Sequence, residues 1–237
     1  MQEDAAYADW KRYQAANAFR YGRKDAKYYR GQFAGQRFRG ARLLELGYGA
    51  GQFLAWARDQ GAEVCGTEIN TPAVEHGRAA GYEVHHGPVE EIAALREREF
   101  DLIVAIDVLE HLDDATLART LDWIVAHLSV EGRCIARVPN AASPFGLPVQ
   151  AGDLTHLQTL SAEKFRQLSH RHGFELLSCR NQYRSWAGGF PALRQALART
   201  ARRATEAWLR FILELRDAPL DMNIVVTLRR KRDTGPR

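Results

Sequence analysis

Residues 43–53 read Leu-Leu-Glu-Leu-Gly-Tyr-Gly-Ala-Gly-Gln-Phe, and this stretch indicates the fold of the whole chain. An apolar run carries the acid Glu45, three glycines follow at every second position, and a second apolar segment then begins. This order predicts a buried strand, a tight turn and the start of a helix. Glycine tolerates positive φ and lets the backbone approach a ligand closely, and the first turn of a helix offers N–H donors. We therefore expect residues 45–51 to form a cofactor cradle.

A second acid, Glu68, supports this expectation. It ends the next strand-like segment, residues 63–68, and lies about 20 residues beyond Gly49. A carboxylate there can accept hydrogen bonds from both hydroxyls of a ribose, because it offers two acceptor oxygens. Gln52 stands where a dinucleotide-binding turn would carry its third glycine, so the spacing departs from that pattern. Glu45 would face a cationic part of the cofactor rather than a pyrophosphate.

These residues resemble the cofactor site of the class I S-adenosylmethionine (SAM)-dependent methyltransferases. Residues 100–112, in which Val108 follows Asp107, are similar to the fourth strand of that family and its exit. The resemblance covers residues 41–184 and the strand near Ile224. It implies a SAM-dependent methyltransferase of the α/β class, with a Rossmann-like sheet of seven strands and helices on both faces. That sheet would be mostly parallel, with an antiparallel last strand.

The resemblance also implies which residues contact SAM. Glu45 would interact with the methionine amino end, Glu68 would bind the ribose, and Asp107 would lie beside the cofactor. The expected cofactor contacts are Glu45, Gly47, Tyr48, Gly49, Gly51, Glu68, Ile69, Val89, Glu90, Asp107 and Val108.

The adenine contact departs from the family pattern. Many members carry an acid just after the third strand, which receives the adenine amino group, and Pro88 stands near that position here. Proline offers neither a side-chain acceptor nor an N–H. Adenine is therefore expected on the backbone of Val89 or on Glu90.

The core of the chain alternates strand-like and helix-like segments. Repeated strand–helix–strand units require a parallel sheet with helices on both faces, and ligands bind outside the carboxyl ends of its strands. Glu45, Glu68 and Asp107 all stand at such ends, so the pattern brings them to one site. Strands are expected at 42–46, 63–68, 82–86, 101–107 and 133–138, and helices at 52–60, 71–80, 89–95 and 113–128.

Beyond the fifth strand, the sequence predicts a loop at 139–148, a helix opened by Ser161, and strands at 174–183 and 222–228. The resemblance implies that these two strands pair antiparallel at one edge of the sheet. The chain then divides into an N-terminal helical cap (1–40), the methyltransferase core (41–184 and 220–230), a basic amphipathic helical insertion (185–219) and a tail (231–237).

Composition is ordinary for a soluble globular protein, and the features below lead us to expect it in the cytoplasm. The 237 residues are 46% hydrophobic and 26% charged, with a formal net charge of +4. No apolar run approaches the roughly 20 residues that span a bilayer, and the acidic N-terminus does not resemble a secretory signal. The three cysteines lie far apart and no Cys/His spacing resembles a zinc site, so we expect reduced thiols and no metal.

Positive charge gathers in residues 194–216 and in the tail. Within the insertion, apolar side chains such as Leu197, Trp208 and Phe211 fall on one helical face, and the arginines fall largely elsewhere. A basic amphipathic helix of this kind can lie on a membrane surface. Peripheral contact of residues 190–216 with the anionic inner membrane surface is one interpretation, and a lid, a dimer contact or a core-packing helix are the others.

The acceptor side of the site is expected near the loop after the fifth strand. A hydroxyl nucleophile gains from a general base, and imidazole titrates near neutral pH. We take His156 as the candidate base, oriented by Asp153; the alternative is that both side chains only fasten the loop. The candidate substrate-binding residues are His111, Tyr28 and Asn140, and the resemblance implies that N-terminal helices help to line the substrate pocket.

The loop pattern of residues 139–156, followed by a helix and Gly173, resembles methyltransferases that modify sugars of bacterial surface glycans. This resemblance implies O-methylation of a sugar hydroxyl in a glycan or in a lipid-linked or phosphorylated intermediate. The alternatives are a methyltransferase of a small metabolite, such as a quinone precursor, and a non-catalytic SAM-binding regulatory protein. Nucleic acid is not expected as a partner, because no base-methylation motif follows the fourth strand.

Overall fold

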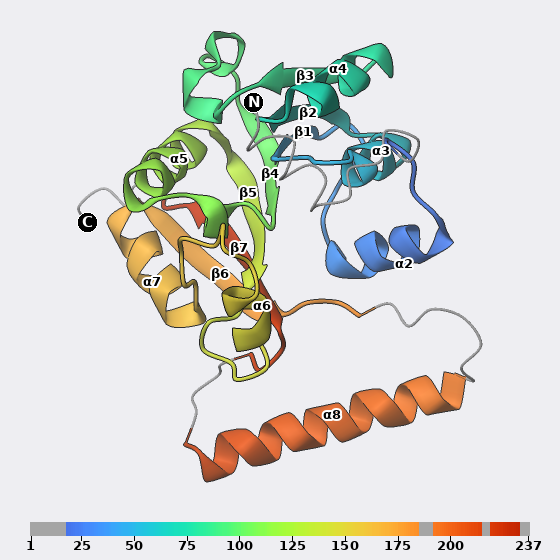
Figure 1. Cartoon of the computed structure of the whole chain (residues 1–237), viewed down its shortest axis with the longest axis vertical. Coiled ribbons are helices and arrows are strands. Elements are labelled where there is room, and N and C mark those ends of the chain that lie inside the picture. Colours follow the sequence, from blue (N-terminus) through green and yellow to red (C-terminus); the bar gives the residue numbers. More distant parts are fainter. Residues whose placement is uncertain (1–17, 185–191, 215–218, 233–237) are drawn as a thin grey trace.

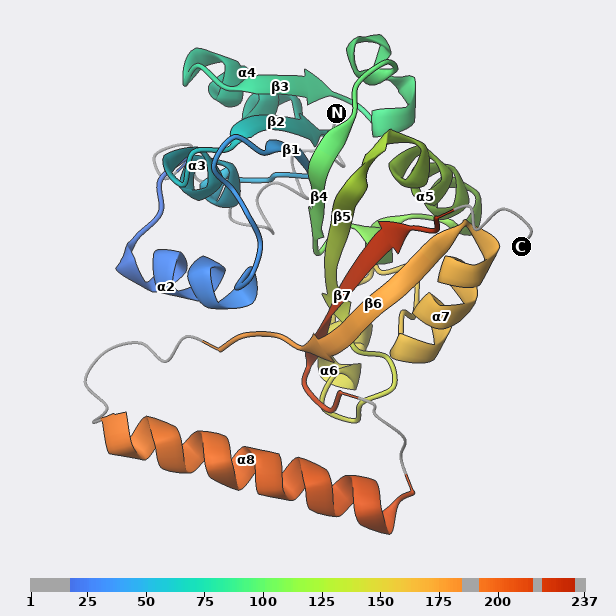
Figure 2. The same cartoon turned by 180° about the vertical axis from the view of Figure 1, so that it is seen from behind.

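The computed structural model describes residues 18–184, 192–214 and 219–232. One sheet of seven strands runs through the molecule in the spatial order β3-β2-β1-β4-β5-β7-β6, with helices on either side (Figures 1 and 2). The strands are β1 (Arg42–Leu46), β2 (Glu63–Glu68), β3 (Glu83–His86), β4 (Phe100–Ile106), β5 (Leu128–Pro139), β6 (Phe174–Asn181) and β7 (Asn223–Arg230).

The strand directions confirm the expected fold class. Strands β1 to β5 run parallel, whereas β7 runs antiparallel to both of its neighbours, β5 and β6. Leu46 at the end of β1 pairs with Thr67 of β2 and with Ala105 of β4, so the carboxyl ends of these strands lie side by side. The largest difference from the expected bounds is in β5, which begins at Leu128.

The helices also follow the expected order, with two exceptions. A short helix at Leu147–Ala151 was not expected, because the sequence predicted a loop at 139–148. Residues 89–95 form two 3₁₀ turns, Val89–Glu91 (η2) and Ala93–Leu95 (η3), instead of one α-helix, because Ile92 between them is extended at φ −83° and ψ 101°. A third 3₁₀ turn, η4, covers Leu109–His111. The α-helices are α2 (Arg23–Gln32), α3 (Gln52–Asp59), α4 (Thr71–Ala79), α5 (Asp114–His127), α6 (Leu147–Ala151), α7 (Ala162–Arg171) and α8 (Ala192–Ile212).

Short polar side chains fix where three helices begin. Asn70 at α4, Asp113 at α5 and Ser161 at α7 each accept a hydrogen bond from the backbone N–H three residues further on. These bonds satisfy donors that the first turn of a helix leaves without a partner. The caps of α4 and α5 thereby define the loops that leave the carboxyl ends of β2 and β4.

The middle of the sheet is buried on both faces. Along β4, Ile103 and Ala105 belong to the apolar cluster that contains the inner sides of α5 and α7, while Leu102 and Val104 belong to the cluster around α2, α3 and α4. Successive side chains of a strand point to opposite faces, so such a strand reads as one apolar run. Because both faces are covered there, the strand ends are where this region can receive a ligand.

Helix α8 stands apart from this body. Both views place it at the end of the molecule where α2 and α6 lie (Figures 1 and 2). Neither apolar cluster of the described residues contains a residue of α8. Among the helices of the described ranges, none is long and apolar enough to cross a membrane.

Candidate active site

A cavity of about 720 Å³ lies where the carboxyl ends of β1, β2 and β4 meet. The chain order reverses between β1 and β4, and open α/β sheets bind ligands at such a point. Helix α2 contributes Tyr28 and Tyr29 to the wall of this cavity. Its volume falls within the range of about 300–1,000 Å³ that is usual for small-molecule sites.

The structure brings most of the expected site residues together. Glu45 and Glu68 line one and the same cavity. The expected residues that lie off its wall are Gly51, Asn140, Asp153 and His156. The expected residues that line it are Tyr28, Glu45, Gly47, Tyr48, Gly49, Glu68, Ile69, Val89, Glu90, Asp107, Val108 and His111.

The turn after β1 is shaped for the close approach of a ligand. Gly49 has φ +53°, and a Cβ there would meet no atom within 4 Å. Gly47 has φ +59°, and a Cβ there would lie 2.6 Å from the side chain of Val108. Both backbone conformations favour glycine. The bare backbone at Gly49 therefore leaves open space on the cavity wall.

Gly51 supports the same turn from outside the cavity. It is the N-cap of α3 with φ +68°, and a Cβ there would lie 2.3 Å from the ring of Phe19. Phe19 stacks on Tyr82 with ring centroids 4.2 Å apart, and its N–H donates to the Ala50 carbonyl. The segment before α2 thus packs on the back of the cradle, and Gly51 makes room for it.

Three backbone N–H groups hold the carboxylate of Glu68. Gly49 donates to Oε2 at 2.9 Å, and Ile69 and Asn70 donate to Oε1 at 2.8 and 3.0 Å. Glu68 thereby ties the glycine turn to the end of β2, a structural role that the sequence did not predict. Because an ionised carboxylate has about four acceptor positions, Oε2 keeps one for a ligand hydroxyl.

Glu45 is enclosed beneath the cavity. Its side chain is buried, and its Oε2 has no hydrogen-bond partner among the described residues. Burial, followed by the charge of Glu68, raises the pKa of the Glu45 carboxyl well above its usual value. A buried acceptor without a donor is unfavourable. A cationic donor in the cavity would satisfy it.

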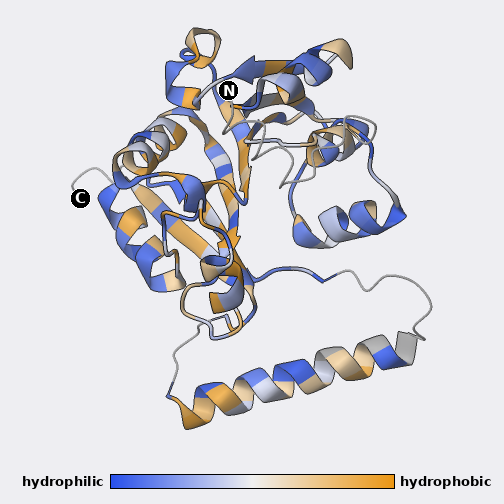
Figure 3. Ribbon diagram, viewed as in Figure 1, coloured by the Kyte–Doolittle hydropathy of each residue, from blue (hydrophilic) through white to orange (hydrophobic). Residues whose placement is uncertain are grey.

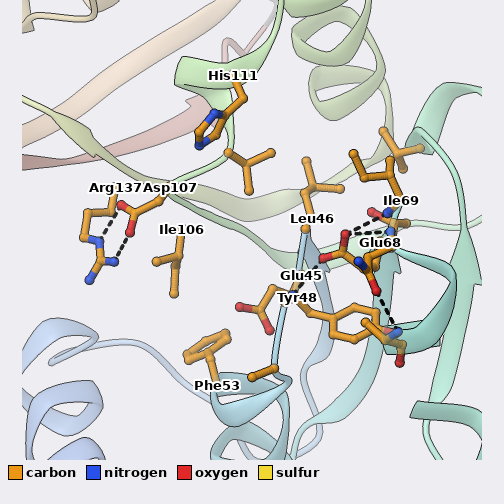
Figure 4. A pocket seen from close by; sticks show the side chains of 18 of the residues that line it. Glu45, Leu46, Tyr48, Phe53, Glu68, Ile69, Ile106, Asp107, His111 and Arg137 are labelled. Carbon is orange, nitrogen blue, oxygen red and sulfur yellow. Dashed lines mark hydrogen bonds and ion pairs between the residues drawn. The ribbon is translucent and has the colours of Figure 1, made fainter. Parts of the chain in front are cut away.

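An ion pair that the sequence did not predict forms the wall away from Glu68 (Figure 4). Arg137 of β5 donates to both carboxylate oxygens of Asp107, with Nε 2.8 Å from Oδ1, and its Nη1 donates to the Tyr28 hydroxyl at 2.7 Å. Burial lowers the pKa of the Arg137 guanidinium, but the charge of Asp107 and these hydrogen bonds outweigh burial and raise the pKa. The contacts fasten α2 to the ends of β4 and β5. The feature of the sequence that could have predicted these contacts is Arg137 itself, a charged residue inside an otherwise apolar segment.

His111 lines the same side of the cavity and is held by the loop after α6. Its Nδ1 lies 2.9 Å from Thr155 Oγ1 and 3.2 Å from the Thr155 carbonyl oxygen. The Thr155 hydroxyl donates to Asp153 Oδ1 at 2.6 Å, so it accepts from His111. Both contacts place the proton of neutral His111 on Nδ1 and the lone pair on Nε2. Asp153 thus orients His111 through Thr155.

His156 lies behind His111, and their ring centroids are 4.8 Å apart. Its side chain is almost fully buried, with Nε2 3.5 Å from Asp153. Glu110, His111 and His156 each place one ligand atom within 4.8 Å of the others, so these three residues could hold a metal ion. The sequence had predicted no metal here, because these residues do not stand at a recognised spacing.

Asn140 also has a structural position. Its side chain is buried, and its amide donates to the carbonyl oxygens of Pro219 and Asp221 at 2.7 and 3.1 Å. These bonds connect the end of β5 to the segment that leads into β7. The structure therefore places Asn140 away from the cavity that it was expected to line.

The sequence model of a protein family described as a methyltransferase domain matches residues 18–179, from the segment before α2 to β6. This match covers well over half of the chain. The chain belongs to the methyltransferase domain family. Membership indicates SAM as the cofactor, in agreement with the resemblance of the glycine turn and Glu68.

Stretches of the methyltransferase are similar to two named relatives. Over 83 residues it is 32% identical to the ubiquinone biosynthesis O-methyltransferase of Aromatoleum aromaticum, covering 32% of this chain and 35% of that protein. Over 99 residues it is 29% identical to the ubiquinone biosynthesis O-methyltransferase of Bordetella pertussis, covering 36% of this chain and 41% of that protein. The matches thus span less than half the length of these relatives.

Solved structures share the fold of the methyltransferase. A TehB-like SAM-dependent methyltransferase from Corynebacterium glutamicum superposes with a TM-score of 0.59 at 17% identity, covering 97% of this chain and 99% of that one. A SAM-dependent methyltransferase from Archaeoglobus fulgidus gives a TM-score of 0.59 at 17% identity, covering 87% and 91%.

The cavity of the methyltransferase fits SAM on two observations. The Glu45 Oε2 atom is a buried acceptor that lacks a donor, which suits an ammonium group. Gly49 presents open backbone beside Glu68, so a ribose can approach both.

Proposed function

We propose that the methyltransferase transfers a methyl group from SAM to a hydroxyl of a small, largely apolar acceptor, such as a quinone precursor. The observation that carries this proposal is the continuous cavity that connects the cradle of Glu45 and Glu68 with His111. A methyl donor held at one side and an imidazole at the other suit O-methylation, since a hydroxyl nucleophile gains from a general base. Orientation of the two reactants is the main contribution of a protein to such a reaction.

The cradle would hold the cofactor through three groups of this chain. Glu45 would accept hydrogen bonds from the methionine ammonium group, Glu68 would accept one from the ribose, and Gly49 would leave room for both. Glu90 would border the adenine at the wall formed by η2. When bound, SAM supplies a methyl group on a sulfonium, which becomes a neutral thioether on transfer.

His111 would serve as the general base. Its Nε2 is buried in the ligand-free structure. After a rotation of the ring that exposes it, Nε2 would take the proton of the acceptor hydroxyl while the acceptor oxygen forms its bond to the methyl group. Thr155 and Asp153 hold the other ring proton on Nδ1, which leaves the lone pair on Nε2. A positioned base contributes typically about 10²–10⁴-fold to rate. His111 replaces His156 as the proposed base, because His111 is the one on the cavity wall.

The character of the wall favours an aromatic alcohol as the acceptor. Tyr28, Phe53, Ile106 and Leu112 line the cavity with aromatic and aliphatic surface. The charge of Arg137 is compensated by Asp107. A sugar would bring several hydroxyl groups, each of which loses free energy when it is buried without a partner. The partial similarity to ubiquinone biosynthesis O-methyltransferases supports the same acceptor class.

Acceptor profiling with methyl-labelled SAM tests the proposal. The purified chain is incubated with a panel of catechols and other phenols and, separately, with free sugars and sugar nucleotides, and products are analysed by mass spectrometry. We expect label on a phenolic hydroxyl. Label on sugars alone would support the glycan acceptor that the loop of residues 139–156 resembles. Tight SAM binding without transfer to any acceptor would support a regulatory SAM-binding protein instead.

A further inference from the structure

Helix α8 contacts the body of the protein through polar side chains. Arg202 Nη2 lies 2.5 Å from Asp221 Oδ2, and the Asn181 amide donates to Glu206 Oε1 at 2.7 Å. Helices that pack on a protein usually turn an apolar stripe inward. In α8 the charged side faces the body.

The apolar side of α8 faces away from these contacts. Phe211 lies nine residues after Arg202, which is two and a half turns and therefore the opposite side of the helix. Phe211 is 82% exposed, and Trp208 and Leu197 are each 61% exposed. These three residues share one side because they are separated by three and eleven positions, close to whole turns. We call Leu197, Trp208 and Phe211 the outer stripe.

Further exposed apolar side chains lie at the same end of the molecule. Phe145 and Leu147 at the start of α6 and Leu154 in the loop after it are exposed. Both views place α6 next to the end of the molecule that α8 occupies (Figures 1 and 2). Figure 3 shows hydrophobic segments alternating with hydrophilic ones along α8. Apolar surface at this end therefore extends beyond one helix.

The charge of α8 selects among the surfaces that could cover the outer stripe. The helix contains five arginines and one glutamate. Arg203 and Arg210 are seven residues apart, so they share one side of the helix, about a quarter turn from Phe211 and between the outer stripe and the side that faces the body. Arg210 also lies 3.8 Å from Glu206. A second copy of the chain would bring the same positive helix to the contact. A surface of anionic lipids complements the charge and accepts the apolar side chains.

We propose that the outer stripe of α8 binds the surface of a membrane that contains anionic lipids. The helix lies in the interface with its aromatic side chains among the acyl chains and with Arg203 and Arg210 at the level of the headgroups. At about 30 Å for its 21 residues, α8 offers several turns of contact. Because α2, a wall of the cavity, lies at the same end of the molecule, docking brings the cavity close to the lipid surface (Figure 1).

Vesicle flotation with the full chain tests this proposal without any methyl transfer. The probes are vesicles of phosphatidylcholine alone and of phosphatidylcholine with phosphatidylglycerol. We expect flotation with the anionic vesicles at low salt and release at high salt, because the attraction extends over a Debye length of about 8 Å at physiological ionic strength. The double variant Trp208→Glu/Phe211→Glu is expected to partition at least about tenfold less, since it places charge in the apolar contact.

A matched control changes an exposed apolar residue elsewhere. Val130 is 75% exposed near the start of β5, away from α8, and Val130→Glu should float like the unmodified chain. Arg203→Glu should weaken flotation on anionic vesicles and leave the thermal melt unchanged. The proposal would be overturned if the double variant floated as well as the unmodified chain. It would also be overturned if the unmodified chain floated as well with phosphatidylcholine alone as with the anionic vesicles. A change from dimer to monomer on sedimentation, with flotation unaffected, would assign the outer stripe to a second copy instead.

Discussion

At the scale of single residues, the two carboxylates of the cradle have opposite surroundings. Three backbone donors satisfy Glu68, whereas Glu45 is buried with an oxygen that has no donor among the described residues. Local rules of polar satisfaction are usually broken where a protein binds something. A cationic group of a ligand therefore gains the most binding free energy when it donates to Glu45.

Glu45→Gln is expected to stabilise the ligand-free enzyme and to weaken SAM binding. A carboxyl whose pKa is raised on folding holds its proton longer in the folded state than in the unfolded state, so stability falls as pH rises from the unfolded pKa through the raised one. Glutamine does not titrate, so the Glu45→Gln variant does not lose this stability as pH rises. We expect Tm to rise at pH 8 and to change little at pH 4, with about 2–4 °C for each kcal/mol in a chain of this size.

Differential scanning fluorimetry at the two pH values and calorimetric titration with SAM check this expectation. If the Tm difference between Glu45→Gln and the unmodified chain did not vary with pH, the raised pKa of Glu45 would be contradicted. Unchanged SAM affinity would remove Glu45 from the cofactor site.

Gly49→Arg is expected to abolish SAM binding, because the side chain would fill the open space on the cavity wall. Gly81 provides the matched control, since it also has positive φ, +75°, and open space around its Cβ, but lies outside the cavity. Gly81→Arg therefore carries a similar backbone strain and should bind SAM normally. Calorimetry on both variants, with thermal melts to compare folding, separates strain from occlusion. Equal SAM affinity in the two variants would refute the cradle.

His111→Ala is expected to lower kcat by about 10²–10⁴-fold with SAM affinity nearly unchanged. His156→Ala, its buried neighbour, should have a much smaller effect on kcat, because His156 lies off the cavity wall. Thermal melts and SAM titrations separate catalysis from structure: in His111→Ala, kcat should fall while Tm and SAM affinity stay close to those of the unmodified chain. A larger loss in His156→Ala would restore His156 as the base.

At the scale of elements, helix α2 completes the cavity because Tyr28 connects it to β5. The hydroxyl of Tyr28 accepts from Arg137, which also pairs with Asp107 at the end of β4. The aromatic rings of Tyr29 and Phe53 pack edge to face and join α2 to α3. One wall of the site thus depends on contacts between segments more than a hundred residues apart.

Tyr28→Phe should loosen this wall, and Tyr21→Phe is its matched control. Both substitutions remove a hydroxyl that bonds a charged side chain, Arg137 in one case and Asp59 in the other. Each should cost roughly 1 kcal/mol or a little more of stability. Only Tyr28→Phe is expected to raise the KM for the acceptor, because Tyr21 does not line the cavity. Equal KM values in steady-state assays would mean that Tyr28 does not shape the acceptor side.

The sequence predicted the elements better than the contacts between them. Apolar runs, glycines and capping residues act over a few positions, so the ends of β1 and β2, and with them Glu45 and Glu68, could be placed from local patterns. The loop after β5 could not, because its position depends on the Glu110 carbonyl, which accepts from the backbone of Leu157 and Gln158. With that distant contact in place, His111 lines the cavity and His156 does not, whereas His156 was expected to face the acceptor.

At the scale of the whole molecule, the described chain has two parts that differ in how they are held together: the sheet with its covering helices, and helix α8. The sheet and its helices share two apolar clusters, one on each face. Helix α8 is joined to them by the Arg202–Asp221 and Asn181–Glu206 contacts. Two polar contacts contribute little to stability compared with the apolar area that the two clusters bury. Opening of α8 should therefore cost much less free energy than opening of the sheet.

Hydrogen exchange followed by mass spectrometry checks this difference. Amides of residues 192–212 are expected to exchange much faster than those of β4, whose opening would expose both apolar clusters. Saturating SAM should slow exchange in the turn at residues 45–51 and leave α8 unchanged, since ligand binding protects the part of the structure that it contacts. Exchange in α8 as slow as in β4 would show that α8 belongs to the cooperative core. In that case the outer stripe would be part of a folded unit, and its exposure would need a different explanation from contact with a lipid surface.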